Sequence, residues 1–499
     1  MNHLVQSKNK KVILFAGVFV FLSFNCFLNI HYSIDSFNIL TSANQDVSNH
    51  IQNGRIFYWL VVSLLNFLDI SLVLNNILWV FVFMCVLVFS ISILTIKATK
   101  YFSNDSSAVI LVFLAVSVSF VHGFIAEWFQ FTEALLMYSF SVLGSVLAVI
   151  VFPLKQEENN RILKYFLAFV FLTISYNSYQ IGINYFIFYI LCFILLESEN
   201  QLSLTGIRNT CVAAFLVLLT FSVNYAIVKI LISANLISSW SRITTVSMNN
   251  ITFNLYTLFL PHTQYDFWLR GNGMLKNPDL LLLLLMSLPA AIFTLISEKK
   301  KWYDFLFVFI LLVGGVFALI LPLLIVDVFW MAPRTVVPFF CIYTFLMLIL
   351  AKNKRSIPKN IAIVVLALFL LRQVWFIQNY SADVRTSNNY DKMWTEYIDT
   401  EIAKYEENNQ ISVTQIGYLK DDSAAWSWDD ISYSWDVCNR SIVVDWAQNH
   451  LLSFYTNRNL DVVQIPDHIK SHFQSSTQTE SLLDTMVFFE ENTCYVYIH

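Results

Sequence analysis

The chain has 499 residues, of which 57% are hydrophobic and only 13% are charged, with a net charge of −4. Soluble globular proteins carry about 25% charged residues, so this composition excludes an ordinary soluble domain and indicates a chain that crosses a membrane many times. The 11 glycines leave few positions for a glycine-rich phosphate loop, and the sequence contains no such loop. We therefore expect no soluble nucleotide cofactor and no nucleic-acid partner.

Apolar segments long enough, or nearly long enough, to cross a bilayer recur along the first 378 residues, since a crossing helix needs about 20 residues. We place eleven of them, at 12–30, 73–96, 107–123, 134–153, 163–176, 179–196, 209–232, 279–297, 304–325, 335–351 and 360–378. No small-residue cleavage site follows the first, so we expect it to remain as a span. The fifth and sixth share one apolar run, which breaks at a turn containing Tyr179 and Gln180.

Lys and Arg are distributed unequally between the two sets of loops. With the N-terminus inside, the inner set is Lys8, Lys10, Lys11, Lys97, Lys100, Lys155, Arg161, Lys164, Arg208, Lys299, Lys300, Lys301, Lys352, Lys354, Arg355 and Lys359. The outer loops hold only Arg55, Arg242, Arg270, Lys276 and Arg334. Because cytoplasmic loops are enriched in Lys and Arg, this bias predicts a cytoplasmic N-terminus and places the tail, 379–499, on the outer side.

Four predicted outer loops hold most of the candidate site residues, at 31–72, 122–133, 233–278 and 326–334. Their candidate carboxylates are Asp35, Asp46, Glu127 and Glu133, and their candidate arginines are Arg55, Arg242, Arg270 and Arg334. The first loop also contains an apolar run, Ile56–Ile70, that is too short to span. It predicts a helix lying on the outer surface of the membrane.

The tail has the pattern of a small α/β domain. An apolar face with a period of 3.6 residues predicts a helix near 383–407. Short β-type runs follow at 411–419, 441–447, 460–466 and 486–498, and the last has the length of a hairpin with EENT as its turn. If the tail faces an oxidising compartment, Cys438 and Cys494 could form a disulfide.

Aromatic and acidic residues gather between these runs. They include Trp426, Trp428, Trp435 and Asp429. Such a set could contact an acceptor sugar, because aromatic faces stack on sugar C–H groups and carboxylates accept hydrogen bonds from hydroxyls. Core tryptophans beside a solvated acidic turn are the alternative interpretation.

Three stretches resemble the serotype-converting O-antigen glucosyltransferases, the Gtr family, within the GT-C class of membrane glycosyltransferases. They are HYSID followed by QNGRIFYWLVVSLL, AEWFQFTEALLMYSF, and ISYNSYQIGINYFIFYILCFILL. The resemblance implies a bacterial inner-membrane enzyme that moves glucose from a polyprenyl-phosphate-linked donor to an O-antigen repeat of lipopolysaccharide, with inversion, on the periplasmic face. Related first loops often carry two adjacent acidic residues, whereas Ser36 follows Asp35 here, so a metal role is left open.

This chemistry needs a general base for the acceptor hydroxyl and positive charge for the departing phosphate. Asp35 is the first candidate base, because a lipid-linked donor reaches the site through the bilayer and Asp35 follows the first span closely. Asp46, Glu127 and Glu133 are the alternatives. Arg55 and Arg334 are the first candidates for the phosphate, ahead of Arg242 and Arg270. No second histidine lies at metal-ligand spacing from His262 in the third outer loop. We therefore expect no cofactor and assign no metal ligands, and metal dependence stays open.

Three other functions stay open at this point. An O-antigen polymerase also has many spans and outer arginines, but usually places its large loop between spans. A transporter of lipid-linked sugar tends to show internal repeats and charges within spans, and the two halves of this sequence show no repeat. An acyltransferase would use a histidine base, and His31, His50 and His122 are available.

Overall fold

The computed structural model describes residues 2–41, 50–51, 53–102, 105–155, 159–236, 249, 251–254, 278–324, 333–421, 440–475 and 485–498. The chain forms two compact units. Unit 1 comprises Met1–Asn29, Asp46–Phe129 and Ala134–Gln378. Unit 2 comprises the tail, Asn379–His499, together with two short outer-loop segments, Ile30–Gln45 and Gln130–Glu133.

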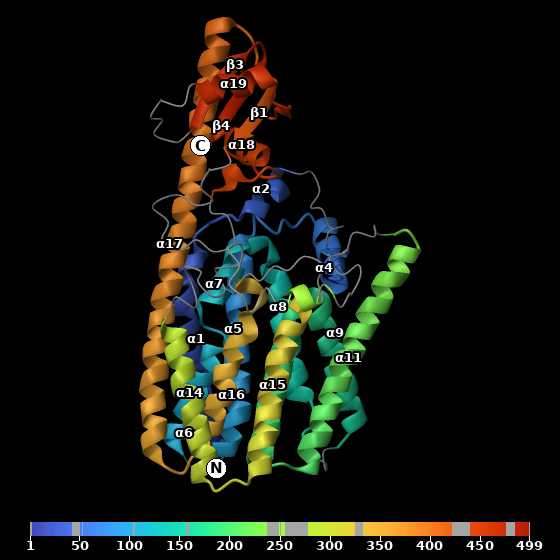
Figure 1. Ribbon diagram of the computed structural model, residues 1–499, viewed down its shortest axis with the longest axis vertical. Coiled ribbons are helices and arrows are strands. Elements are labelled where there is room, and N and C mark those ends of the chain that lie inside the picture. The colour runs from blue at the N-terminus through green and yellow to red at the C-terminus, as the bar shows by residue number, and fades with distance from the viewer. Residues whose placement is uncertain are drawn as a thin grey trace. The chain divides into compact units, whose positions relative to one another are not determined.

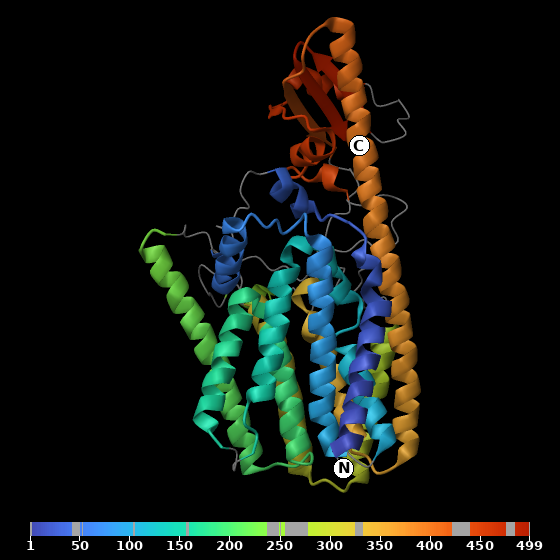
Figure 2. The same ribbon diagram turned by 180° about the vertical axis from the view of Figure 1, so that it is seen from behind.

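Unit 1 consists of helices, most of which run alongside one another (Figures 1 and 2). Its longer helices are α1 (Asn2–Phe24), α4 (Ile56–Phe67), α5 (Asn76–Thr99), α6 (Ser106–Val118), α7 (Gly123–Gln130), α8 (Leu135–Val151), α9 (Arg161–Ser178), α10 (Ile183–Glu197), α11 (Leu204–Ser233), α14 (Pro278–Ser297), α15 (Trp302–Leu324), α16 (Cys341–Ala351) and the first part of α17 (Ser356–Asn409). Short 3₁₀ turns are η1 (Asn25–Leu28), η2 (Lys100–Phe102), η3 (Thr132–Ala134), η4 (Gln180–Gly182), η6 (Pro333–Thr335) and η7 (Val337–Phe340).

Among the described residues, 7 helices are long and apolar enough to cross a membrane, or 8 if the bent pair α6 and α7 forms one span. This count does not confirm the eleven predicted spans. Each of the eleven segments contains a helix, but α9, α14 and α16 are not among those that qualify. Helix α9 carries Arg161 and Lys164 in its first turns, and the apolar stretches of α14 and α16 are short. The predicted surface segment forms α4.

Small and hydroxyl residues bring the central helices of unit 1 close together. A Cβ added at Gly144 of α8 would lie 2.7 Å from the carbonyl oxygen of Phe171 in α9, so only glycine fits there. The next residue of α8, Ser145, donates through its Oγ to the carbonyl oxygen of Gly182 at 2.7 Å. Such contacts are typical of helices that pack within a membrane. Outward-facing helices expose apolar residues, including Phe215 on α11 and Phe309 on α15, which suits a surface covered by lipid.

Unit 2 contains a four-stranded sheet in the order β2-β1-β4-β3. Strand β1 (Gln415–Lys420) is parallel to both β2 (Asp461–Val462) and β4 (Thr493–Ile498), and β3 (Thr485–Glu490) is antiparallel to β4. The hairpin predicted with EENT as its turn is therefore confirmed. Unit 2 also contains α2 (Ile34–Thr41), η8 (Ser441–Val443), α18 (Gln448–Thr456) and α19 (Asp467–Ser475).

Two predictions for the tail need correction. The run 441–447 is not a strand: it begins with η8, and Ile442, Val443 and Val444 are all buried. A half-buried strand would bury only alternate residues. Here backbone hydrogen bonds such as that from Val443 N to the Arg440 carbonyl close a tight turn, and this turn lets all three side chains face inward. The predicted tail helix is also not separate, because it is the second part of α17. Its apolar face is correctly predicted, since Trp394, Ile398 and Ile402 are completely buried.

Candidate functional site

Asp35 lies in the first turn of α2, in unit 2. The two serines that flank this turn fold it: Ser36 N donates to Ser33 Oγ at 3.2 Å, and Ser33 N donates to Ser36 Oγ at 3.0 Å. This reciprocal arrangement resembles a capping box. It buries both serines but leaves Asp35 exposed, at a helix N-terminus where a negative charge is favoured.

Glu133, from the second outer loop, meets the same turn. Its Oε1 accepts a hydrogen bond from Ser33 Oγ at 2.7 Å, and its Oε2 accepts one from Ser36 Oγ at 3.0 Å. The side chain is buried, and burying a carboxylate is costly unless hydrogen bonds compensate it. Asp35 is close enough to act on Glu133 as a like charge.

These contacts change the interpretation of Ser36. From the sequence alone, Ser36 is only a departure from the two adjacent acidic residues that the resemblance leads one to expect. In the structure, its hydroxyl binds a carboxylate that lies 97 positions further along the chain. Unit 2 thus brings together Asp35 and Glu133, two of the four predicted carboxylates, one exposed and one buried.

The tail holds α2 through contacts that the sequence analysis missed. Asn388 of α17 binds the backbone of Tyr32 in both directions, accepting from Tyr32 N at 2.8 Å and donating to Tyr32 O at 3.0 Å. The ring of Phe37 packs against Phe454 of α18, with centroids 5.7 Å apart. Thr41 also bonds to Nδ1 of His450, whose pKa burial lowers below its usual value. The helix that carries Asp35 is therefore fixed at both ends.

Unit 1 brings together another predicted pair, Glu127 and Arg334. The Arg334 guanidinium donates to Glu127 Oε1 at 2.6 Å, and the Arg334 backbone N–H donates to Oε2 at 2.6 Å. The Glu127 side chain is fully buried and that of Arg334 is 14% exposed. Trp128 Nε1 donates to the Arg334 carbonyl at 3.0 Å, so three bonds fix this arginine.

Arg55 is connected to the same cluster through aromatic rings. Its guanidinium lies over the ring of Tyr179, 5.2 Å from the centroid. The rings of Tyr179 and Trp128 form an edge-to-face contact, with their centroids 6.0 Å apart. Among the described residues, no carboxylate lies within 4.0 Å of Arg55. The two leading phosphate candidates are therefore linked by two rings, and one of them has no carboxylate partner in the described part of the chain.

The turn that presents Arg55 is held by polar residues of the predicted spans. Gly54 adopts φ +72°, a conformation that favours glycine. Asn224 Nδ2 donates to the Gly54 carbonyl at 2.7 Å, and Gln180 Nε2 donates to the Asn53 carbonyl at 2.7 Å. Gln180 therefore has a structural role at this turn. Asn224 was missed, although an asparagine within an apolar run is a detectable signal.

The other predicted site residues lie outside the described part of the chain. These are Asp46, Arg242, Arg270, Trp426, Trp428, Trp435, Asp429 and Cys438. Cys494 is described: its side chain is buried in β4, and burial raises the pKa of its thiol to about 12. The disulfide with Cys438 stays a prediction. Within the described residues, no group of three or more His, Cys, Asp or Glu side chains could hold a metal ion.

Comparison with protein families gives one match. The model of the glucosyl transferase GtrII family matches residues 24–351, more than half of the chain. The matched segment includes Asp35, Arg55, Glu127 and Arg334. Comparisons with curated proteins and with solved structures found no match. The resemblance to Gtr-type enzymes is thus confirmed, and the chain belongs to the GtrII family of glucosyl transferases.

Proposed function

We propose that this protein transfers a glucosyl residue from a polyprenyl-phosphate-linked donor to a hydroxyl of an O-antigen repeat, on the periplasmic face of a bacterial inner membrane. The family match supports glycosyl transfer. The donor, the acceptor and serotype conversion as the outcome follow from the Gtr resemblance. We propose no cofactor, and the metal dependence of the reaction is left to experiment.

The proposed topology is a GT-C-like arrangement of eleven spans with a cytoplasmic N-terminus and a periplasmic tail, 379–499. The excess of Lys and Arg in the predicted inner loops supports this orientation. It places Asp35 and Glu133 on the side where a lipid-linked sugar would meet its acceptor. The acidic and aromatic run that includes Trp426, Trp428, Trp435 and Asp429 would contact the acceptor there.

Asp35 is the proposed general base. The observation that carries this role is its exposure on a turn that buried hydrogen bonds hold in place. It would take the proton of the acceptor hydroxyl while that oxygen attacks the anomeric carbon opposite the phosphate, which inverts the configuration. Glu133 is buried and accepts a hydrogen bond on each oxygen, so we assign it to positioning the turn.

The arginines of unit 1 would stabilise the leaving group. As the bond from the anomeric carbon to the phosphate oxygen breaks, the electron pair stays with the polyprenyl phosphate. Arginine pairs well with this charge, because its planar group donates two parallel hydrogen bonds to phosphate. Arg55 is the first candidate, since no carboxylate of the described chain pairs with it. Glu127 fixes Arg334 in one orientation, which would give the phosphate a preorganised second partner.

Sugar transfer in proteoliposomes tests this proposal. Labelled polyprenyl-phosphate glucose and O-antigen are supplied to the parent protein, to Asp35→Asn and to Asp69→Asn. Asp69 is a suitable control: it is exposed, lies in the same predicted outer loop, and has φ 56°, which asparagine tolerates.

We expect transfer by the parent and the control, and a loss of about 10²- to 10⁴-fold in Asp35→Asn. Transfer that survives in Asp35→Asn would overturn the base assignment and move it to Asp46, Glu127 or Glu133. No transfer by the parent from any lipid-linked sugar would overturn the glucosyltransferase proposal itself and favour a polymerase or a transporter.

A further inference from the structure

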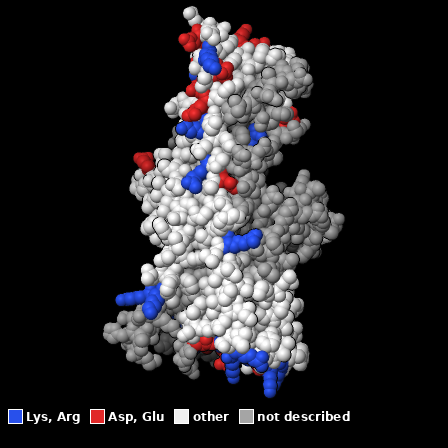
Figure 3. Space-filling view, turned by 90° about the vertical axis from the view of Figure 1, so that its left-hand side faces the viewer, with Lys and Arg blue, Asp and Glu red and all other residues white. Residues whose placement is uncertain are grey.

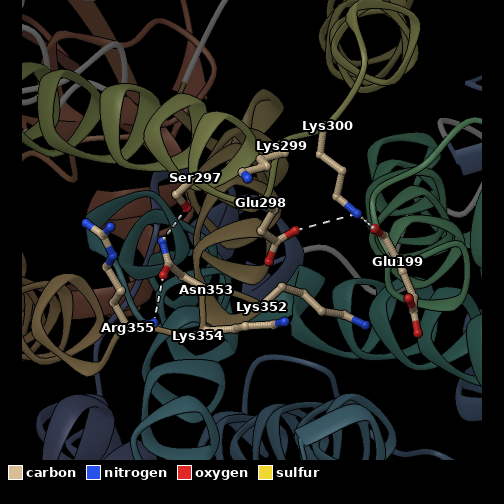
Figure 4. Close-up of a pocket in the computed structure, with 9 residues that line it drawn as sticks. All are labelled: Glu199, Ser297, Glu298, Lys299, Lys300, Lys352, Asn353, Lys354 and Arg355. Atoms are coloured by element: carbon tan, nitrogen blue, oxygen red, sulfur yellow. Dashed lines mark hydrogen bonds and ion pairs between the residues drawn. The ribbon is translucent and has the colours of Figure 1, made fainter.

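Three interhelical connections line a basic pocket at one end of unit 1. They are the α10–α11 connection, which contributes Glu199, the α14–α15 connection, and the α16–α17 connection. The pocket has a volume of about 620 Å³ (Figure 4). It lies at the end of unit 1 where the chain begins, and the space-filling view shows Lys and Arg gathered at the lower end of the molecule (Figures 1 and 3).

Positive charge dominates this pocket. Its cations are Lys299, Lys300, Lys352, Lys354 and Arg355, and its carboxylates are Glu199 and Glu298. Five positive charges against two negative ones leave a formal excess of three. Like charges gathered in one pocket repel one another, and a bound anion would offset this repulsion.

Two of the lysines have a structural role. Lys300 Nζ donates to the carbonyl oxygen of Glu199 at 2.6 Å, and Lys352 Nζ donates to that of Leu196 at 3.1 Å. Both therefore satisfy carbonyls at the C-terminal end of α10 and its following turn. Glu298 lies 3.6 Å from Lys300. Figure 4 shows the Lys352 and Lys354 side chains running beside each other on the opposite side of Glu298.

Two of the remaining three cations lie on a turn that the Asn353 side chain holds through hydrogen bonds. Asn353 is buried; its Nδ2 donates to Thr294 Oγ1 at 3.2 Å, and its Oδ1 accepts from Arg355 N at 2.8 Å. Lys354, between the two bonded residues, and Arg355 are exposed, and Lys299 is exposed on the α14–α15 connection. No carboxylate of the described chain forms an ion pair with any of these three within 4.0 Å.

Burial shifts the pKa values of two residues in the pocket, in directions that would favour the binding of an anion. It lowers the pKa of Lys352 and raises the pKa of Glu298. Both shifts mean that the charged form lacks the solvation it would have in water. A bound anion would stabilise charged Lys352, and protonation of Glu298 would remove its repulsion.

We propose that this pocket binds a phosphate-bearing anion, supplied by the headgroup of an acidic phospholipid. Lysines with a nearby arginine are the common protein partners of phosphate, and basic pockets between spans bind acidic headgroups. The source is indicated by the surroundings: Ile296, Trp302 and Ile357 flank the pocket in sequence and are 61%, 75% and 71% exposed. These apolar side chains would meet acyl chains while the headgroup enters the pocket.

A loop that merely obeys the positive-inside rule would also be basic. Binding at a specific site differs from the general attraction of a basic loop to anionic lipid, because specific binding saturates and depends on particular side chains. The matched variants are Lys354→Gln with Arg355→Gln in the pocket, and Lys10→Gln with Lys11→Gln in α1. Both pairs are exposed, both lie on the predicted cytoplasmic side, and both remove two positive charges.

In the experiment, each probe is titrated into the purified full-length protein in nonionic detergent, and binding is measured as a shift in the thermal unfolding temperature. The probes are phosphatidylglycerol, phosphatidylcholine and inorganic phosphate, each at low and high salt. We expect a saturable stabilisation by phosphatidylglycerol alone. Its midpoint should rise about 30-fold in the pocket variant and less than about twofold in the α1 variant.

Each other outcome overturns part or all of the proposal. Equal stabilisation by inorganic phosphate would retain the phosphate pocket but overturn the lipid as its source. Equal weakening in both variants, or stabilisation by phosphatidylcholine as strong as by phosphatidylglycerol, would overturn the pocket. If the pocket variant is itself unstable, native mass spectrometry of the single variant Lys299→Gln replaces it. The number of bound phosphatidylglycerol molecules should then fall relative to the parent, and an unchanged number would overturn the pocket.

Discussion

Glu127 and Glu133 lie in one predicted outer loop, yet the structure gives them different surroundings. Glu127, in unit 1, is fully buried against Arg334 and forms an ion pair with it. Glu133, in unit 2, is held by two neutral serine hydroxyls and lies beside a like charge on Asp35. Two carboxylates of one loop therefore have different local partners. The first carboxylate fixes an arginine, and the second shapes the turn that presents a candidate base.

The largest effect should follow from breaking the charged pair. Arg334→Gln leaves Glu127 as a buried charge without its guanidinium partner, which should cost about 3–5 kcal/mol in the free energy of unfolding. Adding Glu127→Gln should restore most of the loss, because the lone charge is gone and the glutamine oxygen still accepts from the backbone N–H. Tryptophan fluorescence during chemical unfolding measures both variants.

The same double variant separates stability from function. If Arg334 binds the donor phosphate, the double variant should stay inactive in sugar transfer although its stability has recovered. Recovery of transfer together with stability would show that Arg334 only supports the fold. Equal stability of Arg334→Gln and the parent would contradict the prediction that the ion pair stabilises unit 1.

Glu133→Gln should have a smaller effect on stability, about 1–3 kcal/mol, because one of the two serine hydroxyls then faces an amide N–H₂ in place of an acceptor. Asp35→Asn should change stability by less than about 0.5 kcal/mol, since Asp35 is exposed. Sugar transfer should show the opposite order, with the greater loss in Asp35→Asn. The same unfolding and transfer assays measure this pair, and a greater loss of transfer in Glu133→Gln would reverse the two assigned roles.

The sequence located these carboxylates but not their partners, for a physical reason. Composition and span length place Asp35, Glu127 and Glu133 in outer loops, since a charge is costly in lipid. Hydrogen bonds such as Ser33 to Glu133 join residues 100 positions apart, and no local pattern records them. Ser36 is the clearest case, because its role depends on what lies beside it in space.

The same distinction explains the fold predictions. The β3–β4 hairpin is a local structure, so the length of its β-type run and the EENT turn were sufficient to predict it. The continuity of α17 was missed because composition changes from apolar to polar near Gln378. A change of composition does not end a helix, however, and no glycine or proline interrupts α17 between Lys359 and Asn409.

Asn388 tests whether the tail positions the Asp35 helix. Asn388→Ala removes both hydrogen bonds to the Tyr32 backbone, which should cost about 1–2 kcal/mol. If those bonds hold Asp35 in its productive position, kcat for transfer should also fall several-fold. The neighbouring Asn389 is exposed, so Asn389→Ala is the matched control. Equal transfer rates in the two variants would mean that α2 keeps its position without this clamp.

A modest effect should come from the turn that holds Arg55, and it sharpens the contrast with Arg334, which is fixed by charge. A Cβ at Gly54 would lie 3.1 Å from Asn224 Oδ1, and the residue has φ +72°. Gly54→Ala should therefore cost about 1 kcal/mol and displace Arg55. At Gly17 of α1 an added Cβ meets no atom within 4 Å, so Gly17→Ala is the control.

The kinetic consequence depends on when Arg55 meets the phosphate. If it binds the donor equally in the ground state and the transition state, Gly54→Ala should raise KM for the lipid-linked donor and leave kcat unchanged. A fall in kcat at constant KM would instead mean that Arg55 acts on the charge that develops as the phosphate leaves. An unchanged KM and kcat would remove Arg55 from the phosphate site and leave Arg334 as its arginine.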